Sequence, residues 1–548
     1  MKRLVLGLLS FTALLSSPAL RAATARLPLF DGLSNYTRTV TTSSPTAQRY
    51  FDQGLAFTYG FDKERAIQSF QEAMKLDPQC AMAWWGIANA CGPNINAPEV
   101  DAEHNTLALA ALAKAQAAAA RGTPAEQALI RAQVLRFSVA TKAARHALDK
   151  AYAAAMREAW HAHPEDADMG VLFAESLLDL RPWDQWQPDG QPQPGTDEAL
   201  AALKVALTVS PDHPFGLHLM IHAFEASPHP ENAVPAADRL RAQRSLIGHM
   251  EHMPSHIDVR VGRWAEAVES NERAIQSDLR YRREIGEPDF GLVGYMAHNR
   301  HMQAYAALMT GQRTIALGTI KAMVAELPAK VPAEAFGMID GFSAMPYEAM
   351  LRFGQWDEIL AVPVPAEKFV FSRAMLFAAR GIAQAALGHL AEARKEQHAF
   401  LAARARVRSD AGFSTNTMGG ILAVAEAMLD GELLFREGKS DAGLARLRAA
   451  VKAEDALHYD EPPGWIVPVR HALGAALLQV GRVQEAEAVY RDDLKKLPGN
   501  GWSLFGLARS LRLQGRATEA AVVESEFRKV WVKADLELKS SCLCQPGA

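Results

Sequence analysis

Apolar residues recur at intervals of three and four along most of the chain, the spacing expected of amphipathic helices. The pattern is clear from Ala47 onward and extends almost to the end of the sequence. We see no segment with the alternating polar and apolar residues of a half-buried strand. Glycine and proline repeatedly end one helical pattern before the next begins. The sequence therefore predicts an all-α chain of short, consecutive helices.

The predicted helices form pairs with a period of 34 residues. Positions 8, 11, 20, 24, 27 and 32 of the unit that begins at Ala47 hold Gly54, Phe57, Ala66, Phe70, Ala73 and Pro78. Small residues at positions 8 and 20 let two antiparallel helices approach, large residues at 11 and 24 fill the space between them, and proline ends the second helix. Units one period apart begin at Pro214 and Gly248, and again at Val467 and Gly501.

These positions resemble the signature of tetratricopeptide repeat (TPR) proteins. The resemblance covers roughly residues 47–530. It implies a TPR-type α-solenoid, a right-handed superhelix of about a dozen helix-turn-helix units. It also implies that the first helix of each unit lines a concave groove, which in such proteins binds a peptide or a protein partner.

Outside the repeats, the sequence predicts three further segments. A basic start, an apolar run and a small-residue segment are typical of a secretory signal peptide, so we expect a periplasmic or secreted protein. The predicted divisions are a signal peptide (1–25), an N-terminal arm (26–46), N-terminal TPR units (47–213), central histidine-rich units (214–330), C-terminal units (331–530) and a tail (531–548).

Three segments interrupt the helical pattern. Arg181–Gly195 is rich in proline and glycine, Arg282–Met296 displaces the following unit, and Thr415–Gly420 precedes a late helix. The first two flank the histidine-rich units, so they are either lids over a site or ordinary surface insertions. As lids, they would cover a substrate with aromatic side chains, namely Trp183, Trp186, Phe290 and Tyr295.

Histidines are concentrated in the central units, where nine of the 17 lie between His213 and His301. Seven of them fall on one phase of the repeat, in the first helices of three successive units: His218, His222, His249, His252, His256, His298 and His301. Steps of three, four and seven residues return to one side of a helix. Neighbouring first helices pack about 8–10 Å apart, so their imidazoles can converge.

This convergence predicts a metal site in the central groove. Several buried imidazoles without partners are costly, so they need a metal, an anion or a substrate. Imidazole with carboxylate and no thiolate suits copper, zinc or iron, and the set is large enough for one or two ions per chain. Glu225, and Glu175 on the preceding first helix, are the candidate proton-transferring catalytic residues. Pro254 interrupts the helix between His252 and His256 and is expected to rotate one ring from the other.

The same stretch resembles an exported bacterial branch of TPR proteins. Its motifs are a His-x-x-x-His-x-x-Glu-Ala-Ser helix, a Gly-His-x-x-His-Met-Pro-x-His-Ile segment and a His-Asn-x-His segment, found here at 218–227, 248–257 and 298–301. The resemblance marks the stretch as a site and implies no particular reaction.

Several classes of function are disfavoured. The net charge of −4 and the absence of basic patches argue against nucleic acid as a partner. No apolar stretch after the signal peptide is long enough to span a membrane. Gly-rich phosphate loops, the G-x-S-x-G motif and His-Glu-x-x-His are absent. Cys542 and Cys544 are expected in a frayed tail, with a metal or redox role as the alternative.

The sequence thus predicts a metal-binding solenoid, either a hydrolytic or oxidative metalloenzyme acting on a small molecule or peptide in the groove, or a protein that sequesters or delivers metal. The remaining alternative is a TPR scaffold that binds a peptide or protein without catalysis.

Overall fold

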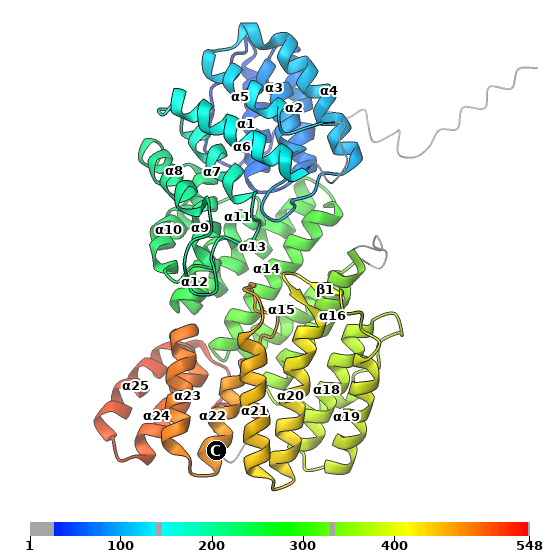
Figure 1. Ribbon diagram of the computed structural model, residues 1–548, viewed down its shortest axis with the longest axis vertical. Coiled ribbons are helices and arrows are strands. Elements are labelled where there is room, and N and C mark those ends of the chain that lie inside the picture. Colours follow the sequence, from blue (N-terminus) through cyan, green and yellow to red (C-terminus); the bar gives the residue numbers. More distant parts are fainter. Residues whose placement is uncertain (1–26, 139–144, 329–334, 546–548) are drawn as a thin grey trace, which may run out of the picture.

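The structure is a computed structural model that describes residues 27–138, 145–328 and 335–545. The predicted signal peptide (1–25) lies outside these residues. The described chain is an elongated stack of antiparallel helix pairs, with the N-terminal half at one end and the C-terminal half at the other (Figure 1). The fold is an all-α solenoid of TPR type, as predicted. No helix among the described residues is both long enough and apolar enough to cross a bilayer.

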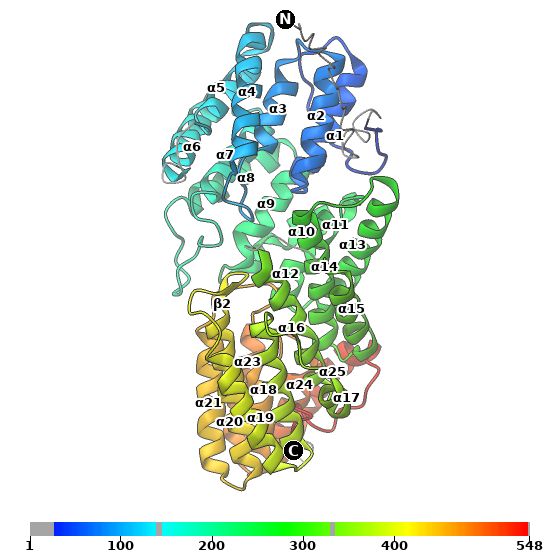
Figure 2. The same ribbon diagram turned by 90° about the vertical axis from the view of Figure 1, so that its right-hand side faces the viewer.

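The N-terminal units pack as successive helix pairs, seen at one end of the molecule in Figure 2. Their helices are α1 (Pro45–Tyr59), α2 (Lys63–Leu76), α3 (Ala81–Ala90), α4 (Ala102–Ala118), η3 (Ala119–Arg121), α5 (Pro124–Val134), α6 (Arg145–Ala162), α7 (Ala167–Leu178) and α8 (Thr196–Val209).

The central units carry the histidine-rich segment. They consist of α9 (Pro214–Glu225), η5 (Pro230–Ala233), α10 (Val234–Gln243), α11 (Gly248–His252), α12 (Pro254–Val261), α13 (Trp264–Glu284), α14 (Phe290–Met309) and α15 (Arg313–Glu326). Three of the four predicted unit starts, Pro214, Gly248 and Gly501, are the first residues of helices, and the helix expected from Val467 begins at Val469.

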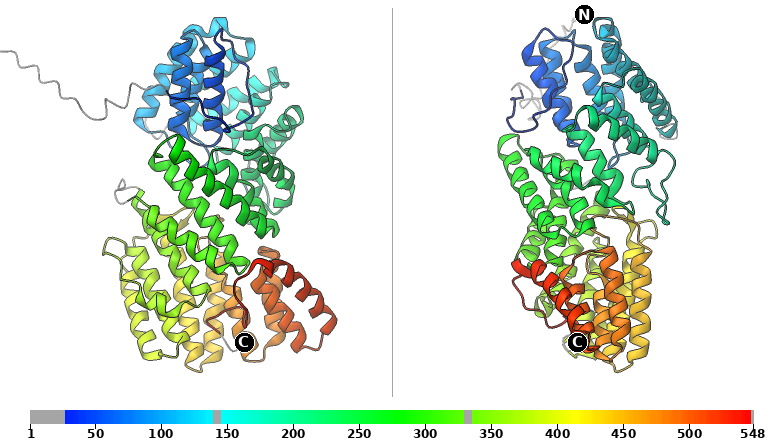
Figure 3. Two further views of the ribbon diagram at one scale, coloured as in Figure 1. Left: turned by 180° about the vertical axis from the view of Figure 1, so that it is seen from behind. Right: turned by 90° about the vertical axis from the view of Figure 1, so that its left-hand side faces the viewer.

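The C-terminal units curve back beneath the central ones (Figure 3). They comprise α16 (Phe336–Arg352), α17 (Trp356–Ala361), α18 (Val370–Ala386), α19 (Leu390–Arg404), β1 (Gly412–Phe413), β2 (Asn416–Thr417), α20 (Met418–Arg436), α21 (Ser440–Asp455), α22 (Val469–Gln479), α23 (Val483–Lys496), α24 (Gly501–Leu513), α25 (Ala517–Val530) and η7 (Trp531–Lys533). The short β1–β2 hairpin overlaps the third predicted interruption and, among the described residues, is the exception to the expected absence of strands.

Glycines at the repeat positions allow the close packing of the helices. The ring of Phe70 lies so close to Gly54 and Gly86 that an added Cβ at either position would approach it to 2.5 Å. Tyr490 occupies the equivalent place between Gly474 and Gly506. A side chain at these glycines would push neighbouring helices apart, because close-packed interiors tolerate little added volume. The small and large positions read from the sequence therefore act as predicted.

The apolar interior consists of two clusters of buried residues that meet in the central units. One extends from Leu33 to Met296 and the other from Val259 to Cys544. Their boundary runs through α12 and α14, the elements that carry His256 and His298. The buried histidines thus lie where the two halves of the solenoid join.

The predicted interruption at Arg282–Met296 is wrong in extent. Helix α13 continues to Glu284, and α14 begins at Phe290, with the Asp289 carboxylate accepting a hydrogen bond from the backbone N–H of Leu292. The break is therefore confined to the short segment around Gly286 and Pro288. The glycines of the following segment are tolerated because the helix packs against its neighbours, and tertiary packing outweighs intrinsic propensity.

Both ends of the described part of the chain are held by the repeats. In the N-terminal arm, the Gly32 and Leu33 carbonyls accept hydrogen bonds from Leu246 N and Ser245 Oγ, both at 2.8 Å. The tail is not frayed, because Cys542 and Cys544 are buried and joined by a disulfide. Side chains of α16 and α20 donate hydrogen bonds to backbone carbonyls of the tail. These contacts join segments far apart in the chain, so the local composition of the tail does not reveal them.

Candidate metal centre

Three segments, from successive helix pairs, bring the histidines together: α9, the α11–α12 pair and α14. Helix α9 presents His218 and His222 four residues apart, and α11 and α12 together present His249, His252 and His256. Pro254 does divide α11 from α12, as expected. It stands at the first position of α12, where a missing backbone N–H is tolerated, so the helical direction continues. His252 and His256 therefore still face each other, contrary to the expected rotation.

The first cluster consists of His218, His222 and His249. The Nε2 atoms of His218 and His222 lie 3.0 Å apart. The His249 ring centroid lies 4.9 Å from that of His218, and neither of its buried nitrogens has a hydrogen-bond partner. One nitrogen from each of the three rings falls within 4.8 Å of the others. Metal–nitrogen distances are about 2.0–2.1 Å, so small ring rotations would bring all three to one ion.

The second cluster consists of His252, His256 and His298. The Nε2 atoms of His252 and His256 lie 2.6 Å apart, and the His298 ring centroid lies 4.5 Å from that of His252. The three ligand atoms again lie within 4.8 Å of one another. The centroids of His222 and His256 are only 5.9 Å apart, so the two clusters are immediate neighbours.

Four of these rings have a hydrogen-bond acceptor at Nδ1. His218 Nδ1 lies 2.8 Å from the Tyr59 carbonyl oxygen, and His252 Nδ1 lies 2.6 Å from Asn271 Oδ1. Such acceptors assign the proton to Nδ1 and leave the Nε2 lone pair free for a metal. In the His218–His222 pair the two Nε2 lone pairs then point at each other. That arrangement is repulsive unless a proton or a metal ion lies between them.

Glu225 contacts one histidine of each cluster, at the ring nitrogen that faces away from the cluster. Its Oε1 lies 2.8 Å from His222 Nδ1, and its Oε2 lies 2.5 Å from His256 Nδ1. Burial alone would raise the pKa of Glu225, but His222 and His256 outweigh it and hold that pKa at about 2. A single carboxylate thus orients one ligand of each cluster, the role that outer-shell carboxylates play at histidine metal sites.

Glu461 approaches His256 from the loop between α21 and α22. Its Oε2 lies 2.7 Å from His256 Nδ1. Burial would lower the pKa of His256, but Glu461 and Glu225 raise it to about 10. Burial raises the pKa of Glu461 to about 7, against the effect of His256. Glu225, His256 and Glu461 could themselves hold an ion through Nδ1, although their distances are those of hydrogen-bonded ion pairs.

Four rings of the clusters favour the neutral state that binds metal. His218, His249 and His252 expose 2% or less of their surface. Burial, reinforced by neighbouring imidazoles, lowers the pKa of these three rings and of His298 well below the ordinary value. Neutral imidazole is the form that coordinates a metal ion.

Strained aromatic residues border the clusters. Phe61 and Trp183 are non-glycine residues with φ of 61° and 60°. The ring of Phe61 lies 4.7 Å from that of His218, and the ring of Trp183 lies 5.7 Å from that of His222. Tyr295 contacts His249 at 4.5 Å. Left-handed backbone at non-glycine residues is costly and tends to occur at functional sites, where packing enforces it.

Two predicted site residues lie elsewhere. His301 packs its ring against Phe342, 5.9 Å away, and belongs to neither cluster. Burial lowers the pKa of His301 to about 3. Glu175 is buried on α7 beside Asp179 and Arg136, and burial raises the pKa of Glu175 to about 7. Its neighbours are thus an ion pair, not the imidazoles.

Other histidines have structural contacts. His213 is buried at the start of α9, where its Nδ1 accepts from Gly216 N and its Nε2 lies 3.1 Å from Asp168. His229 is exposed beside Glu231. His471 is buried against Arg352 and Asp493.

Sequence reasoning missed three residues behind the clusters. The backbone of Tyr59, the amide of Asn271 and the carboxylate of Glu461 carried no local signal, because none lies in a histidine motif. Only Glu461 had a potential indication, as an acidic residue in a proline-rich loop.

Comparison with known proteins indicates no family. No family model matches the chain, and no curated protein matches it significantly. Solved structures of helical-repeat proteins superpose poorly on this chain. Human IFIT1, solved as a dimer with m7Gppp-AAAA, is 12% identical, covers 90% of this chain and 91% of its own, and has a TM-score of 0.32. The P58(IPK) TPR domain is 13% identical, covers 67% and 97%, and scores 0.18. The Cut9–Hcn1 hetero-tetramer of the APC/C is 14% identical, covers 85% and 76%, and scores 0.31. Structural similarity this low supports no conclusion about this chain.

Proposed function

We propose that this protein is an exported metalloprotein that holds a pair of transition-metal ions in its two three-histidine clusters and uses them for oxidative chemistry. The observation that carries the proposal is the opposed Nε2 atoms of His218 with His222 and of His252 with His256, each pair backed by acceptors at Nδ1. A metal ion between the nitrogens would remove the lone-pair repulsion of His218 and His222, would take the place of the proton between His252 and His256, and would satisfy the buried rings.

The ligand chemistry favours copper. Six imidazoles and no thiolate would surround the ions, whereas di-iron helical proteins use glutamates as direct ligands. Here Glu225 and Glu461 stand behind the rings. Two divalent ions held by neutral ligands would leave a large positive charge in a buried site. Copper has a monovalent state that reduces this charge, and its two oxidation states permit electron transfer to or from a bound substrate.

Metal content tests the proposal directly. The mature protein, purified without a histidine tag and loaded with copper, is expected to retain two equivalents after desalting. His222→Ala and His252→Ala should each remove about one equivalent, since each takes one ligand from a different cluster. His229→Ala is the matched control, because His229 is exposed beside Glu231.

Electron paramagnetic resonance distinguishes a pair from isolated ions. Two adjacent Cu(II) ions are expected to couple and give less signal than the copper content predicts. Each single variant should restore the full signal of one isolated ion. A wild-type protein that retains no metal, or loses none in these variants, would contradict the proposal.

A second function, the binding of an extended peptide, is favoured by one observation. The C-terminal units bind residues 540–545 through the side chains of their inner helices, as a peptide groove would. A chain ending at Lys539 should bind an added peptide with the sequence of the tail, and the full-length chain should not. Calorimetry would measure the difference, and equal binding by both chains would exclude this function.

A further inference from the structure

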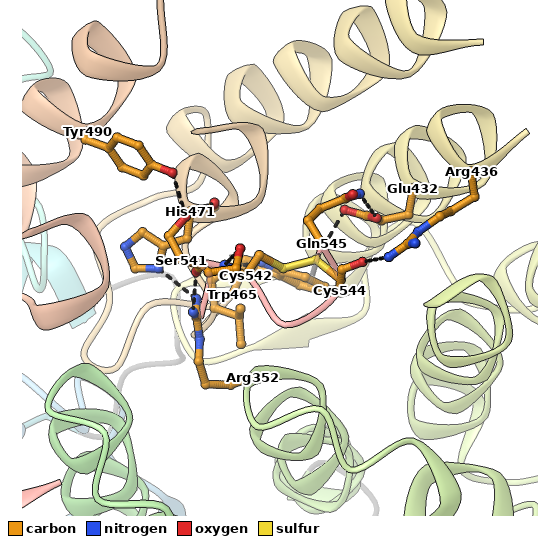
Figure 4. Close-up of a disulfide and its surroundings, with 12 residues drawn as sticks. Arg352, Glu432, Arg436, Trp465, His471, Tyr490, Ser541, Cys542, Cys544 and Gln545 are labelled. Atoms are coloured by element: carbon orange, nitrogen blue, oxygen red, sulfur yellow. Dashed lines mark hydrogen bonds between the residues drawn. A yellow bond between two sulfur atoms is a disulfide. The ribbon is translucent and has the colours of Figure 1, made fainter. Parts of the chain in front are cut away.

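The C-terminal tail returns into the C-terminal half of the solenoid, and its last described residues lie between helices of these units (Figure 4). After η7, the carboxylate of Asp535 accepts hydrogen bonds from the backbone N–H groups of Arg313 and Thr314 at 2.7 and 2.8 Å. The chain then reaches Cys542 and Cys544, whose side chains form a disulfide with a Cα–Cα separation of 5.2 Å. Neither cysteine takes part in the histidine clusters.

Two sets of contacts hold the tail on either side of the disulfide. Before it, Arg352 donates to the Ser541 carbonyl at 3.1 Å, and Ser541 Oγ donates to the His471 carbonyl at 2.9 Å. After it, Arg436 donates to the Cys544 carbonyl, and Gln545 donates to Glu432 (Figure 4). The cysteine pair is therefore fixed in position between inner helices of the solenoid.

A purely structural role explains this disulfide poorly. The stabilisation that a disulfide provides by restricting the unfolded chain falls as the closed loop shortens. The loop between Cys542 and Cys544 contains a single residue, Leu543, so the stabilisation expected from closing it is close to the smallest that a disulfide can provide. The contacts to Ser541, Cys544 and Gln545 hold the tail without it. The bond is thus placed where breaking it would leave the fold largely intact.

A buried carboxyl lies against one sulfur. Glu432 Oε1, on α20, is 3.3 Å from Cys544 Sγ. Burial raises the pKa of Glu432 to about 8, despite the nearby Arg436 and the hydrogen bond from Gln545. Glu432 is therefore largely protonated at neutral pH and able to give a proton to the sulfur beside it. Cys542 is the more exposed of the two, at 8% against 4% for Cys544.

We propose that Cys542 and Cys544 form a redox-active pair that undergoes thiol–disulfide exchange with small thiols, with Glu432 as the proton donor to Cys544. The thiolate of an incoming thiol bonds to Cys542 Sγ and the Cys542–Cys544 bond breaks. The electron pair stays on Cys544 Sγ, which takes the proton of Glu432. A second thiol then displaces Cys542 from the mixed disulfide. Two small thiols become one small disulfide, and the protein gains two thiols.

The geometry assigns different roles to the two sulfurs. The more exposed Cys542 receives the attack, and Cys544 leaves because a proton is available to it. The same contact works in reverse, since the carboxylate of Glu432 can remove the proton of the Cys544 thiol when a small disulfide reoxidises the pair. The charged group that faces Glu432 is Arg436, one turn along α20.

The experiment follows reduction of the full-length, folded protein by dithiothreitol. Samples are quenched with acid, alkylated and digested, and mass spectrometry measures the reduced fraction of the peptide that contains Cys542 and Cys544. That peptide is separate from those of the free Cys80 and Cys91. Glu432→Gln should slow reduction at least tenfold at neutral pH. In the wild-type protein, the reduction rate divided by the thiolate concentration should fall as the pH rises past about 8, because Glu432 then loses its proton. In the variant this ratio should not fall.

Glu437→Gln is the matched control, because it lies at the end of the same helix and contacts Arg394 and Lys439 instead of a sulfur. It should leave the rate unchanged. Single serine variants test the two roles: the Cys544→Ser protein, which retains Cys542, should form a mixed disulfide with an aromatic disulfide at least tenfold faster than Cys542→Ser.

Three results would overturn the proposal. The pair could stay oxidised in excess dithiothreitol while circular dichroism shows a folded protein. Glu432→Gln could reduce at the wild-type rate, or Glu437→Gln could slow reduction equally. All three are independent of whether the histidine clusters bind metal.

Discussion

Glu461 lies 2.7 Å from His256, although the two residues belong to opposite halves of the solenoid. His256 is on α12 of the central units, and Glu461 is on the loop that precedes α22. Arg260, on α12, also lies over the ring of Tyr459 in that loop at 5.2 Å. The second histidine cluster therefore depends on the docking of the C-terminal units.

Glu461→Gln should weaken metal binding at the second cluster by roughly 10–100-fold, the usual effect of losing an outer-shell partner of a histidine ligand. The first cluster should keep its affinity, because His218 and His222 do not contact Glu461. A copper titration followed by calorimetry should then separate into two phases. Glu231→Gln, at an exposed carboxylate beside His229, is the control. Equal weakening of both phases would contradict the assignment.

Glu225→Gln should weaken both clusters. A glutamine side chain offers one acceptor atom, so it cannot accept from His222 and His256 together, and its neutrality removes a buried negative charge near both ions. We expect at least tenfold weaker binding in each phase of the same titration. If only one phase changes, Glu225 orients a single cluster.

Copper should stabilise the folded protein. Free copper at a hundred times the dissociation constant stabilises by about 2.7 kcal/mol per site if the unfolded chain does not bind it. The midpoint of thermal unfolding should therefore rise with copper concentration and fall again when a chelator is added. The variant with both His222→Ala and His252→Ala should show no such rise. A similar rise in that variant would indicate binding elsewhere.

Asp168→Asn should destabilise the N-terminal units at neutral pH. Arg38 NH1 and the Tyr59 hydroxyl lie 2.7 and 2.6 Å from the Asp168 carboxylate, which is buried. Burial alone would raise the pKa of Asp168, but Arg38 and His213 hold it well below its usual range. Arg38 keeps Asp166 as an ion-pair partner, so the loss of its bond to Asp168 should cost roughly 1–3 kcal/mol, as for other buried hydrogen bonds between charged groups.

This loss should depend on pH. Because the folded pKa of Asp168 is depressed, its contribution is fully present above the unfolded value of about 3.9 and disappears as the pH falls below it. Urea unfolding of both proteins should therefore give a difference that is constant near neutrality and shrinks below about pH 4. A difference that does not shrink on acidification would assign the effect to packing.

The sequence determined the helices, their pairing and the phase of most histidines. Helical periodicity is local, because residues three and four apart share a face whatever the rest of the chain does. Gly54 and Phe70 could be assigned their packing roles on that basis. His218, His222, His249 and His252 could likewise be placed on one side of their helices before any contact was known.

The tertiary structure decided how those histidines divide and what lies behind them. The split into two clusters depends on how closely α9, α11, α12 and α14 pack, and His301 and Glu175 lie outside both clusters because their helix positions face Phe342 and Arg136. The contacts of Glu461 with His256 and of Glu432 with Cys544 join segments far apart in the chain. Such pairings produce no periodic pattern in the sequence, because they depend on the packing of whole units and not on the spacing of residues along one helix.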